Sequence, residues 1–446
     1  MFPAKVKIGG AEINDFWKIS VADGPVVVFF FVASGLALLF LLFKKLSWRW
    51  TVMASAALIL GVLVAVLVWF VCVRVLNLFG MSLGTVTYMW LAAVCGGSSV
   101  AIVNLWDSRR ARKAIAAGSI LLFLITGGLG INAGFGLNRT LGSLFGISTE
   151  TPIILTAPTQ APTQGPPAGP LWQTWVPPAG MPASGTTGSQ IIPNPRSGFT
   201  SRPAGIYLPP AALVPNAPAL PLVILLMGQP GNPDPQYVAA TLDRDAALHG
   251  GLAPIVIVAD QLGDPSIDPL CLDTATYGNA ETFLTHDVVT WAKANLNIIQ
   301  DHRYWTIAGF SNGGQCAISL AAKHPDLWSN VIDISGESFP GSEIQTATLK
   351  DIFGGDQKAY DAQRPVNLLA AHRYVDTVAI FTAGADDPGV LAGQRVVASA
   401  AQSAGMAVTL REIPGGGHSV RALDGGLDIG FEVLYPRFGL SAPATG

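Results

Sequence analysis

Residues 304–322 read YWTIAGFSNGGQCAISLAA, and this stretch decides the expected fold of the C-terminal half of the chain. Residues 305–308 (WTIA) are mostly apolar and favour a β-strand, whereas the residues after Gly314 have helical periodicity. Between them lies the motif GFSNG at residues 309–313, which places a serine on a tight turn between a strand and a helix. Such a turn exposes the serine hydroxyl at the edge of a sheet, so Ser311 is the candidate nucleophile.

Apolar runs and helical patterns alternate on both sides of this motif. Continuous apolar runs such as residues 220–227 (LPLVILLM) are typical of strands buried on both faces of a parallel sheet. The sequence therefore predicts an α/β hydrolase fold, with a doubly wound and mostly parallel sheet. The expected strands are residues 199–208, 220–227, 254–259, 304–310, 331–335, 377–382 and 407–413. The expected helices are residues 236–249, 280–295, 313–323 and 389–404.

A nucleophilic serine needs a general base and an orienting acid. His418 follows the last expected strand on a glycine loop, PGGGHS, where an imidazole can reach over the serine. The acid is expected after the preceding strand, where Asp387 is the first choice and the adjacent Asp386 is the alternative. The resulting order of serine, aspartate and histidine is that of α/β hydrolases.

An oxyanion hole needs two backbone N–H groups directed at one point. The amide of Asn312 lies at the start of the helix after the serine, so it is the first candidate. The second candidate is the amide of Gln229, in the glycine turn that follows the strand at residues 220–227.

The N-terminal part of the chain has a different character. Of the 446 residues 50% are hydrophobic and only 12% are charged, and the apolar residues are concentrated at the front. Four stretches, about residues 26–43, 51–73, 85–106 and 114–134, are long enough to cross a bilayer of about 30 Å. They contain no Asp, Glu or Lys, which argues against ion or proton transport through them. Residues 1–135 are therefore expected to form an N-terminal tail and a four-helix transmembrane domain.

The distribution of basic residues predicts the orientation in the membrane. The loops after the first and third spans carry three and four Lys or Arg residues, whereas the loop between the second and third carries one. By the positive-inside rule, the first and third loops are cytoplasmic. Both termini and the C-terminal domain are then expected outside the cell membrane.

Residues 136–196 are rich in Pro, Gly and Thr, a composition that cannot bury a core, and we expect them to be a linker. The catalytic domain is expected at residues 197–446. If that domain lies in an oxidising compartment, Cys271 and Cys316 can form a disulfide, and two buried free thiols are the alternative.

Other classes of function find little support. The net charge of −3 argues against nucleic acid as a partner. No cluster of His, Asp, Glu or Cys has metal-ligand spacing, and no phosphate-binding or dinucleotide-binding motif occurs, so neither a metal nor another cofactor is expected.

Several ordered pieces of residues 199–438 resemble the putative-esterase (esterase D type) family of α/β hydrolases. They include AGIYLPPAAL at 204–213, LPLVILLMGQPG at 220–231, GNAETFLTHDVVTWAKANL at 278–296, the stretch around GFSNG at 305–336, FGGD at 353–356 and GGGHS at 415–419. The resemblance implies serine hydrolysis of esters or acyl transfer, with Ser311, Asp387 and His418 at the triad positions. Mycolyltransferases of this family have a glutamate where Asp387 stands, which disfavours that activity. The four spans lie outside the resemblance.

The leading expectation is a membrane-anchored serine esterase that hydrolyses lipid or envelope-linked esters, such as aminoacylated phospholipids, on the outer membrane face. Residues 336–374 are expected to form a lid or an acyl-pocket wall lined by Phe339, Ile352, Phe353 and Leu368. Two alternatives remain: an acyltransferase of the mycolyltransferase type, and a non-catalytic binding or accessory membrane protein.

Overall fold

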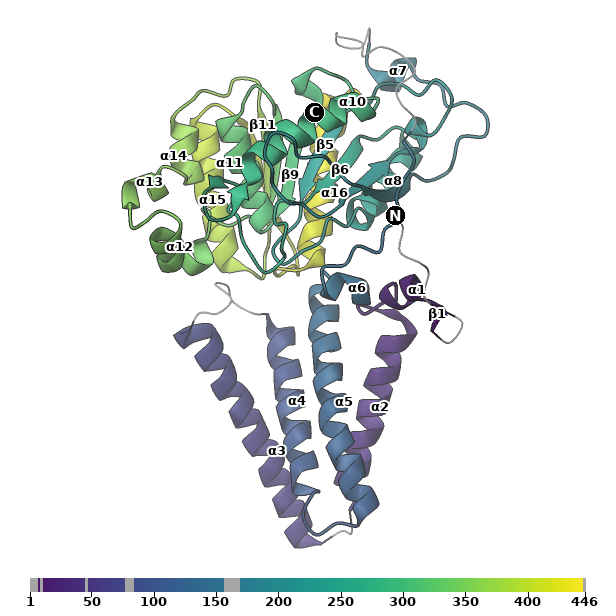
Figure 1. Ribbon diagram of the computed structural model, residues 1–446, viewed down its shortest axis with the longest axis vertical. Coiled ribbons are helices and arrows are strands. Elements are labelled where there is room, and N and C mark those ends of the chain that lie inside the picture. The colour runs from purple at the N-terminus through teal and green to yellow at the C-terminus, as the bar shows by residue number, and fades with distance from the viewer. Residues whose placement is uncertain (1–6, 9–10, 45–46, 77–83, 156–168, 444–446) are drawn as a thin grey trace. The chain divides into compact units, whose positions relative to one another are not determined.

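The structure, a computed structural model, describes residues 7–8, 11–44, 47–76, 84–155 and 169–443 (Figure 1). The chain separates into two compact units, Met1–Thr149 and Glu150–Gly446.

The first unit is built on long apolar helices. Within the described residues, four helices have the length and composition to cross a membrane. They are α2 (Gly24–Leu42), α3 (Trp48–Trp69), which continues as the π-helical turn η1 (Phe70–Val75), α4 (Thr85–Val103) and α5 (Arg110–Phe135). Helix α4 packs between α3 and α5, and α2 packs on α5 (Figure 1). Short helices α1 (Ile13–Trp17) and α6 (Leu141–Leu144) and a two-residue hairpin, β1 (Lys7–Ile8) and β2 (Ala11–Glu12), complete the unit.

Glycines allow these helices to approach closely. A Cβ on Gly61 of α3 would lie 2.5 Å from the carbonyl oxygen of Cys95 in α4. A Cβ on Gly130 of α5 would lie 2.0 Å from the ring of Trp90, again in α4. Since such distances are far below van der Waals contact, these two crossings need glycine.

The second unit contains an eight-stranded sheet in the order β12-β11-β10-β9-β5-β6-β4-β3. The strands from β12 to β6 are parallel to one another, whereas β4 and β3 are antiparallel to their neighbours. The strands are β3 (Thr186–Gln190), β4 (Ala204–Leu208), β5 (Leu222–Leu226), β6 (Ile255–Ala259), β9 (Trp305–Phe310), β10 (Asn330–Ile334), β11 (Val378–Gly384) and β12 (Ala407–Ile413). The central strands β5, β6, β9 and β10 are buried along their whole length, as their apolar sequences predict.

Helices cover both faces of this sheet. Helix α11 (Asn312–Lys323) packs on β9 and β10, and it contacts α14 (Pro365–Ala370), which contacts α15 (Pro388–Ser403). On the other face, α16 (Val420–Arg437) packs on β10 and β11 and contacts α8 (Gln236–Leu248). This is a doubly wound α/β arrangement with a mostly parallel sheet.

The remaining short elements connect these layers. They are α7 (Leu171–Thr174), η2 (Pro210–Ala212), the hairpin β7 (Asp273–Thr274) and β8 (Gly278–Asn279), α9 (Ala280–Thr282), η3 (Phe283–Asp287), α10 (Val288–Asn295), η4 (His302–Tyr304), η5 (Ser342–Ile344), α12 (Gln345–Asp351) and α13 (Gln357–Asp361).

The structure corrects the sequence-based element boundaries in three places. Strand β3 lies inside the expected linker, residues 136–196, because its polar residues Thr186–Gln190 form an edge strand on β4 and need no apolar pattern. The expected strand at 199–208 is shorter and begins at Ala204. Helix α16 was not expected, since its glycines obscure an apolar face that is buried against the sheet. Residues 156–168 of the expected linker lie outside the described residues.

Candidate active site

Ser311 lies at the turn between β9 and α11, in a backbone conformation that side-chain-bearing residues rarely adopt. Its φ and ψ angles are 58° and −121°, and its N–H donates to the carbonyl of Ile334, 2.8 Å away, at the end of the neighbouring strand. Two glycines of the motif allow the backbone of this turn to pass close to neighbouring backbone atoms. A Cβ on Gly309 would lie 2.0 Å from the carbonyl oxygen of Gly313, and a Cβ on Gly313 would lie 2.1 Å from that of Leu226. The strained turn therefore depends on both glycines.

His418 bridges Ser311 and Asp387. Its Nε2 lies 2.6 Å from Oγ of Ser311, and its Nδ1 lies 3.1 Å from Oδ2 of Asp387. The side chains of His418 and Asp387 are each only 8% exposed. The ring of Phe310 packs against the imidazole, with 5.1 Å between the ring centroids. This arrangement suits proton transfer from the serine to an imidazole that a buried carboxylate orients.

The two neighbouring aspartates have different surroundings. Asp387 ends the loop after β11, and its second carboxylate oxygen accepts from the N–H of Val390, at the start of α15, at 3.4 Å. Asp386 is exposed, and its backbone N–H donates to the carbonyl of Gly416 at 2.8 Å. The structure thus brings Asp387, and not Asp386, to His418.

The two candidate oxyanion amides lie on segments that meet at the serine. Asn312 is the first residue of α11, where backbone N–H groups have no partner within the helix. A Cβ on Gly228 would lie 3.1 Å from Cβ of Ser311, so the turn that carries Gln229 runs directly beside the nucleophile. In this turn the N–H of Gly231 donates to the carbonyl of Gly228 at 2.6 Å. Because N–H and C=O of a trans peptide point in opposite directions, the N–H of Gln229 is directed away from that bond.

Cys271 and Cys316 form a disulfide that joins the loop after β6 to α11. Cys316 lies one helical turn beyond Asn312, so the bond ties this loop to the helix that begins at the nucleophile. The other two cysteines, Cys72 and Cys95, are free thiols in the apolar helices.

Three carboxyl groups near the site were not found from the sequence: Asp333 is fully buried, and Asp268 and Glu337 are half-buried. Burial raises the pKa of Asp268 to about 6 and that of Asp333 to about 7. Burial also raises the pKa of Glu337 well above its usual value, and the neighbouring Glu343 carboxyl adds to the rise. The sequence carries no signal for these shifts, because the burial of each carboxyl group depends on how the surrounding segments pack over it. Within the described residues, no group of three His, Cys, Asp or Glu side chains is placed to hold a metal ion.

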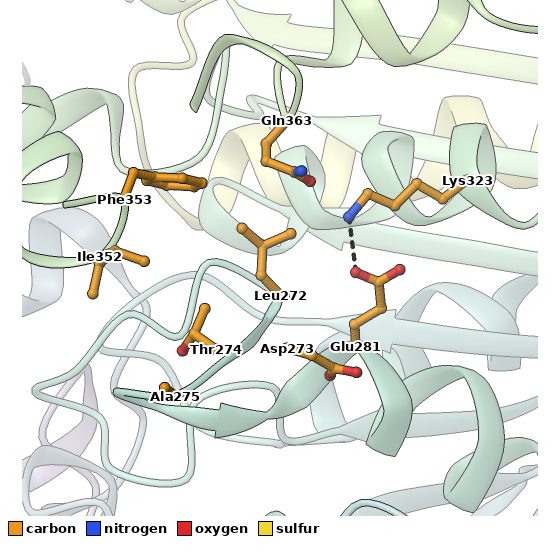
Figure 2. Close-up of a pocket in the computed structure, with 9 residues that line it drawn as sticks. All are labelled: Leu272, Asp273, Thr274, Ala275, Glu281, Lys323, Ile352, Phe353 and Gln363. Atoms are coloured by element: carbon orange, nitrogen blue, oxygen red, sulfur yellow. Dashed lines mark hydrogen bonds and ion pairs between the residues drawn. The ribbon is translucent and has the colours of Figure 1, made fainter. Parts of the chain in front are cut away.

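A separate cavity of about 340 Å³ lies between the hairpin β7–β8, the end of α11 and the α12–α13 region (Figure 2). An ion pair between Lys323 and Glu281, 2.8 Å long, crosses its wall. Ile352 and Phe353, expected to line an acyl pocket, do line this cavity, whereas Phe339 and Leu368 do not. The triad side chains are not part of its wall.

The fold and this geometry define a class. A serine on a strand-turn-helix motif, bonded to a histidine that a buried aspartate orients, on a doubly wound sheet, is the organisation of an α/β hydrolase. The chain belongs to the Putative esterase family, whose family model matches residues 200–423. Its class is therefore that of a serine carboxylic-ester hydrolase.

Two relatives and one solved structure illustrate the similarity. An uncharacterized protein of Corynebacterium glutamicum is 33% identical over 270 residues, which cover 58% of this chain and 62% of that protein. The putative esterase NocK of Nocardia uniformis subsp. tsuyamanensis is 31% identical over 137 residues, 29% of this chain and 38% of NocK. The chain thus matches less than two thirds of the length of either relative. An S-formylglutathione hydrolase from Agrobacterium tumefaciens is similar in structure over 58% of this chain and 97% of its own, with a TM-score of 0.48 and 16% identity.

Proposed function

We propose that this protein is a membrane-anchored serine esterase that hydrolyses lipid or envelope-linked esters, aminoacylated phospholipids among them, on the outer face of the membrane. The observation that carries the proposal is the continuous hydrogen-bonded chain from Ser311 through His418 to Asp387. The apolar helices of the first unit supply the anchor.

In the proposed mechanism, Oγ of Ser311 attacks the ester carbonyl while Nε2 of His418 takes the hydroxyl proton. Asp387 holds the imidazole so that Nε2 faces the serine, and its carboxylate stabilises the imidazolium that forms. The amides of Asn312 and Gln229 stabilise the oxyanion of the tetrahedral intermediate. His418 then gives its proton to the leaving alcohol, and an acyl-enzyme remains on Ser311.

Deacylation repeats these steps with water as the nucleophile. His418 removes a proton from the water, which attacks the acyl carbonyl, and the serine leaves with the proton restored to it. An alcohol in place of this water would transfer the acyl group to that alcohol instead.

Membrane anchoring favours substrates that lie in the same bilayer. A tethered enzyme meets a membrane-borne ester at a high effective concentration, without having to diffuse to it from solution. The low content of ionisable groups in the four helices fits an anchor better than a transport path.

The test begins with the full-length protein in detergent micelles and a fluorophosphonate probe, which reacts with activated serines. Wild type is expected to be labelled, whereas Ser311→Ala and His418→Ala are not. A wild-type protein that is folded yet unlabelled would contradict the catalytic proposal.

The substrate class is tested with the same preparation. Hydrolysis of a long-chain ester and of an aminoacylated phospholipid in mixed micelles is compared with that of a water-soluble short-chain ester. Turnover of only the soluble ester would refute the lipid part of the proposal. An added alcohol acceptor distinguishes the two reactions, since acyl transfer yields a new ester and hydrolysis does not.

A further inference from the structure

A buried glutamine, Gln261, lies between the two segments that carry the candidate oxyanion amides. It follows β6 by two residues, and only 2% of its surface is exposed. An unpaired amide at such a depth would be costly, so its hydrogen bonds indicate why a polar side chain is present there.

The side-chain amide of Gln261 contacts both segments. Its Nε2 donates to the carbonyl oxygen of Met227, immediately before the turn at Gly228. The same nitrogen donates to Oδ1 of Asn312, 3.2 Å away. One NH₂ group therefore joins the start of the glycine turn to the first residue of α11.

The hydrogen bond from Gln261 to Met227 restrains the backbone that orients the N–H of Gln229. The carbonyl of Met227 belongs to the peptide that enters the turn, and the carbonyl of Gly228 in the next peptide is held by Gly231. With both carbonyls bonded, neither peptide plane can rotate freely. The N–H of Gln229 then has one preferred direction relative to Ser311.

The bond to Asn312 restrains the other amide. Only 1% of the surface of Asn312 is exposed, and its backbone N–H is the donor next to the serine. A side chain held at Oδ1 fixes the residue at the start of the helix. The two hydrogen bonds of Gln261 thus restrain both segments that carry the donors.

We infer that Gln261 is a positioning residue of the oxyanion hole, which holds the amides of Gln229 and Asn312 at the spacing that a tetrahedral intermediate requires. This inference rests on the proposed esterase function. Fixed donors stabilise the transition state without reorganising during the reaction, and a misplacement of about 1 Å can cost on the order of 100-fold in rate.

The test compares Gln261→Ala and Gln261→Glu with wild type in the full-length protein. Glutamate preserves the size of the side chain, but its carboxylate cannot donate to Met227. We expect kcat on a soluble ester to fall about 10- to 100-fold in both variants, with KM within about 3-fold. The affinity for a trifluoromethyl ketone, which forms a tetrahedral adduct with the serine, should fall by a similar factor.

Gln394→Ala serves as the matched control. Gln394 is fully buried and its amide also donates two hydrogen bonds, to Asp333 and to the carbonyl of Gly336, and neither partner carries a candidate oxyanion amide. Its loss should lower the melting temperature and leave the ratio between ketone affinity and substrate KM as in wild type.

A double-mutant cycle keeps the test decisive if Gln261→Ala is less stable. Asn312→Ala removes the partner side chain and retains the backbone N–H. The loss in log kcat of the double variant Asn312→Ala/Gln261→Glu should therefore be smaller than the sum of the losses of the two single variants. An active wild type with unchanged kcat in both Gln261 variants, or strictly additive losses, would overturn this inference alone. A wild type without turnover or probe labelling would overturn the proposed function with it.

Discussion

Oδ2 of Asp387 lies 3.1 Å from Nδ1 of His418, and both side chains are almost fully buried. The adjacent Asp386 is exposed, and its backbone N–H donates to the carbonyl of Gly416 in the loop that carries His418. Two carboxylates that are neighbours in sequence thus have different positions relative to the imidazole, and they form a matched pair for mutagenesis.

Asp387→Asn should reduce kcat by about 10⁴-fold, because an amide donating to Nδ1 would favour the wrong tautomer of His418. Asp386→Asn should change kcat by no more than about 2-fold, as is usual for an exposed side chain. Steady-state kinetics on a soluble ester measures both. Equal losses in the two variants would mean that Asp387 is not the orienting acid.

Asp268→Asn should make the protein more stable at neutral pH. Burial raises the pKa of Asp268 to about 6 from an unperturbed 3.8, and the Glu343 carboxyl adds to this rise. The folded state therefore binds the proton more tightly, so the stability contributed by this group is present below pH 4 and lost as pH rises through 6. This difference in pKa corresponds to a loss of at most about 3 kcal/mol in the free energy of unfolding at pH 7.

Urea unfolding of wild type and Asp268→Asn at pH 4 and pH 7 measures this difference. The variant should gain stability relative to wild type at pH 7 and match it at pH 4. Asp386→Asn, which removes an exposed carboxylate, is the control for the loss of one negative charge. If the free energies of unfolding of wild type and Asp268→Asn differ by the same amount at both pH values, the raised pKa of Asp268 is contradicted.

Cys271→Ser should lower the free energy of unfolding by about 4 kcal/mol, since the disulfide to Cys316 closes a loop with a sequence separation of 45. The denatured wild type should show two reactive thiols before reduction and four after it, because Cys72 and Cys95 are free. Thiol titration and thermal denaturation provide the two measurements. Four thiols in the unreduced protein isolated from its native compartment would show that the bond does not form.

Gly309→Ala and Gly313→Ala should prevent folding or destabilise the protein by at least about 3 kcal/mol. Each new methyl group would lie about 2 Å from a backbone carbonyl, where neither the sheet nor the helix can yield. Gly389→Ala, whose Cβ would meet no atom closer than 4.0 Å, is the control and should fold normally. Expression and circular dichroism report the outcome.

The proposed topology predicts that carbonate at high pH will not extract the full-length protein from membranes. Alkaline phosphatase fused after residue 446 should be active, whereas the same enzyme inserted at residue 108, between α4 and α5, should be inactive. The reverse pattern would place the catalytic domain in the cytoplasm.

The sequence by itself determined the alternation of strands and helices around GFSNG and the four long apolar helices. Both signals are local: a continuous apolar run specifies a buried strand or helix, and a glycine pair around a serine specifies one turn. Two elements could not be predicted from such local signals. Edge strand β3 has no apolar pattern, and helix α16 contains several glycines.

Only the tertiary structure decided which side chains meet. Strand order places the ends of β9 and β11 on either side of β10, and the loop after β12 then carries His418 between Ser311 and Asp387. This packing equally decides that Cys271 pairs with Cys316, that Asp268 is half-buried and that Gln261 makes its two contacts. These contacts join residues from 31 to 107 positions apart, and their distances follow from the order of the strands rather than from any local pattern.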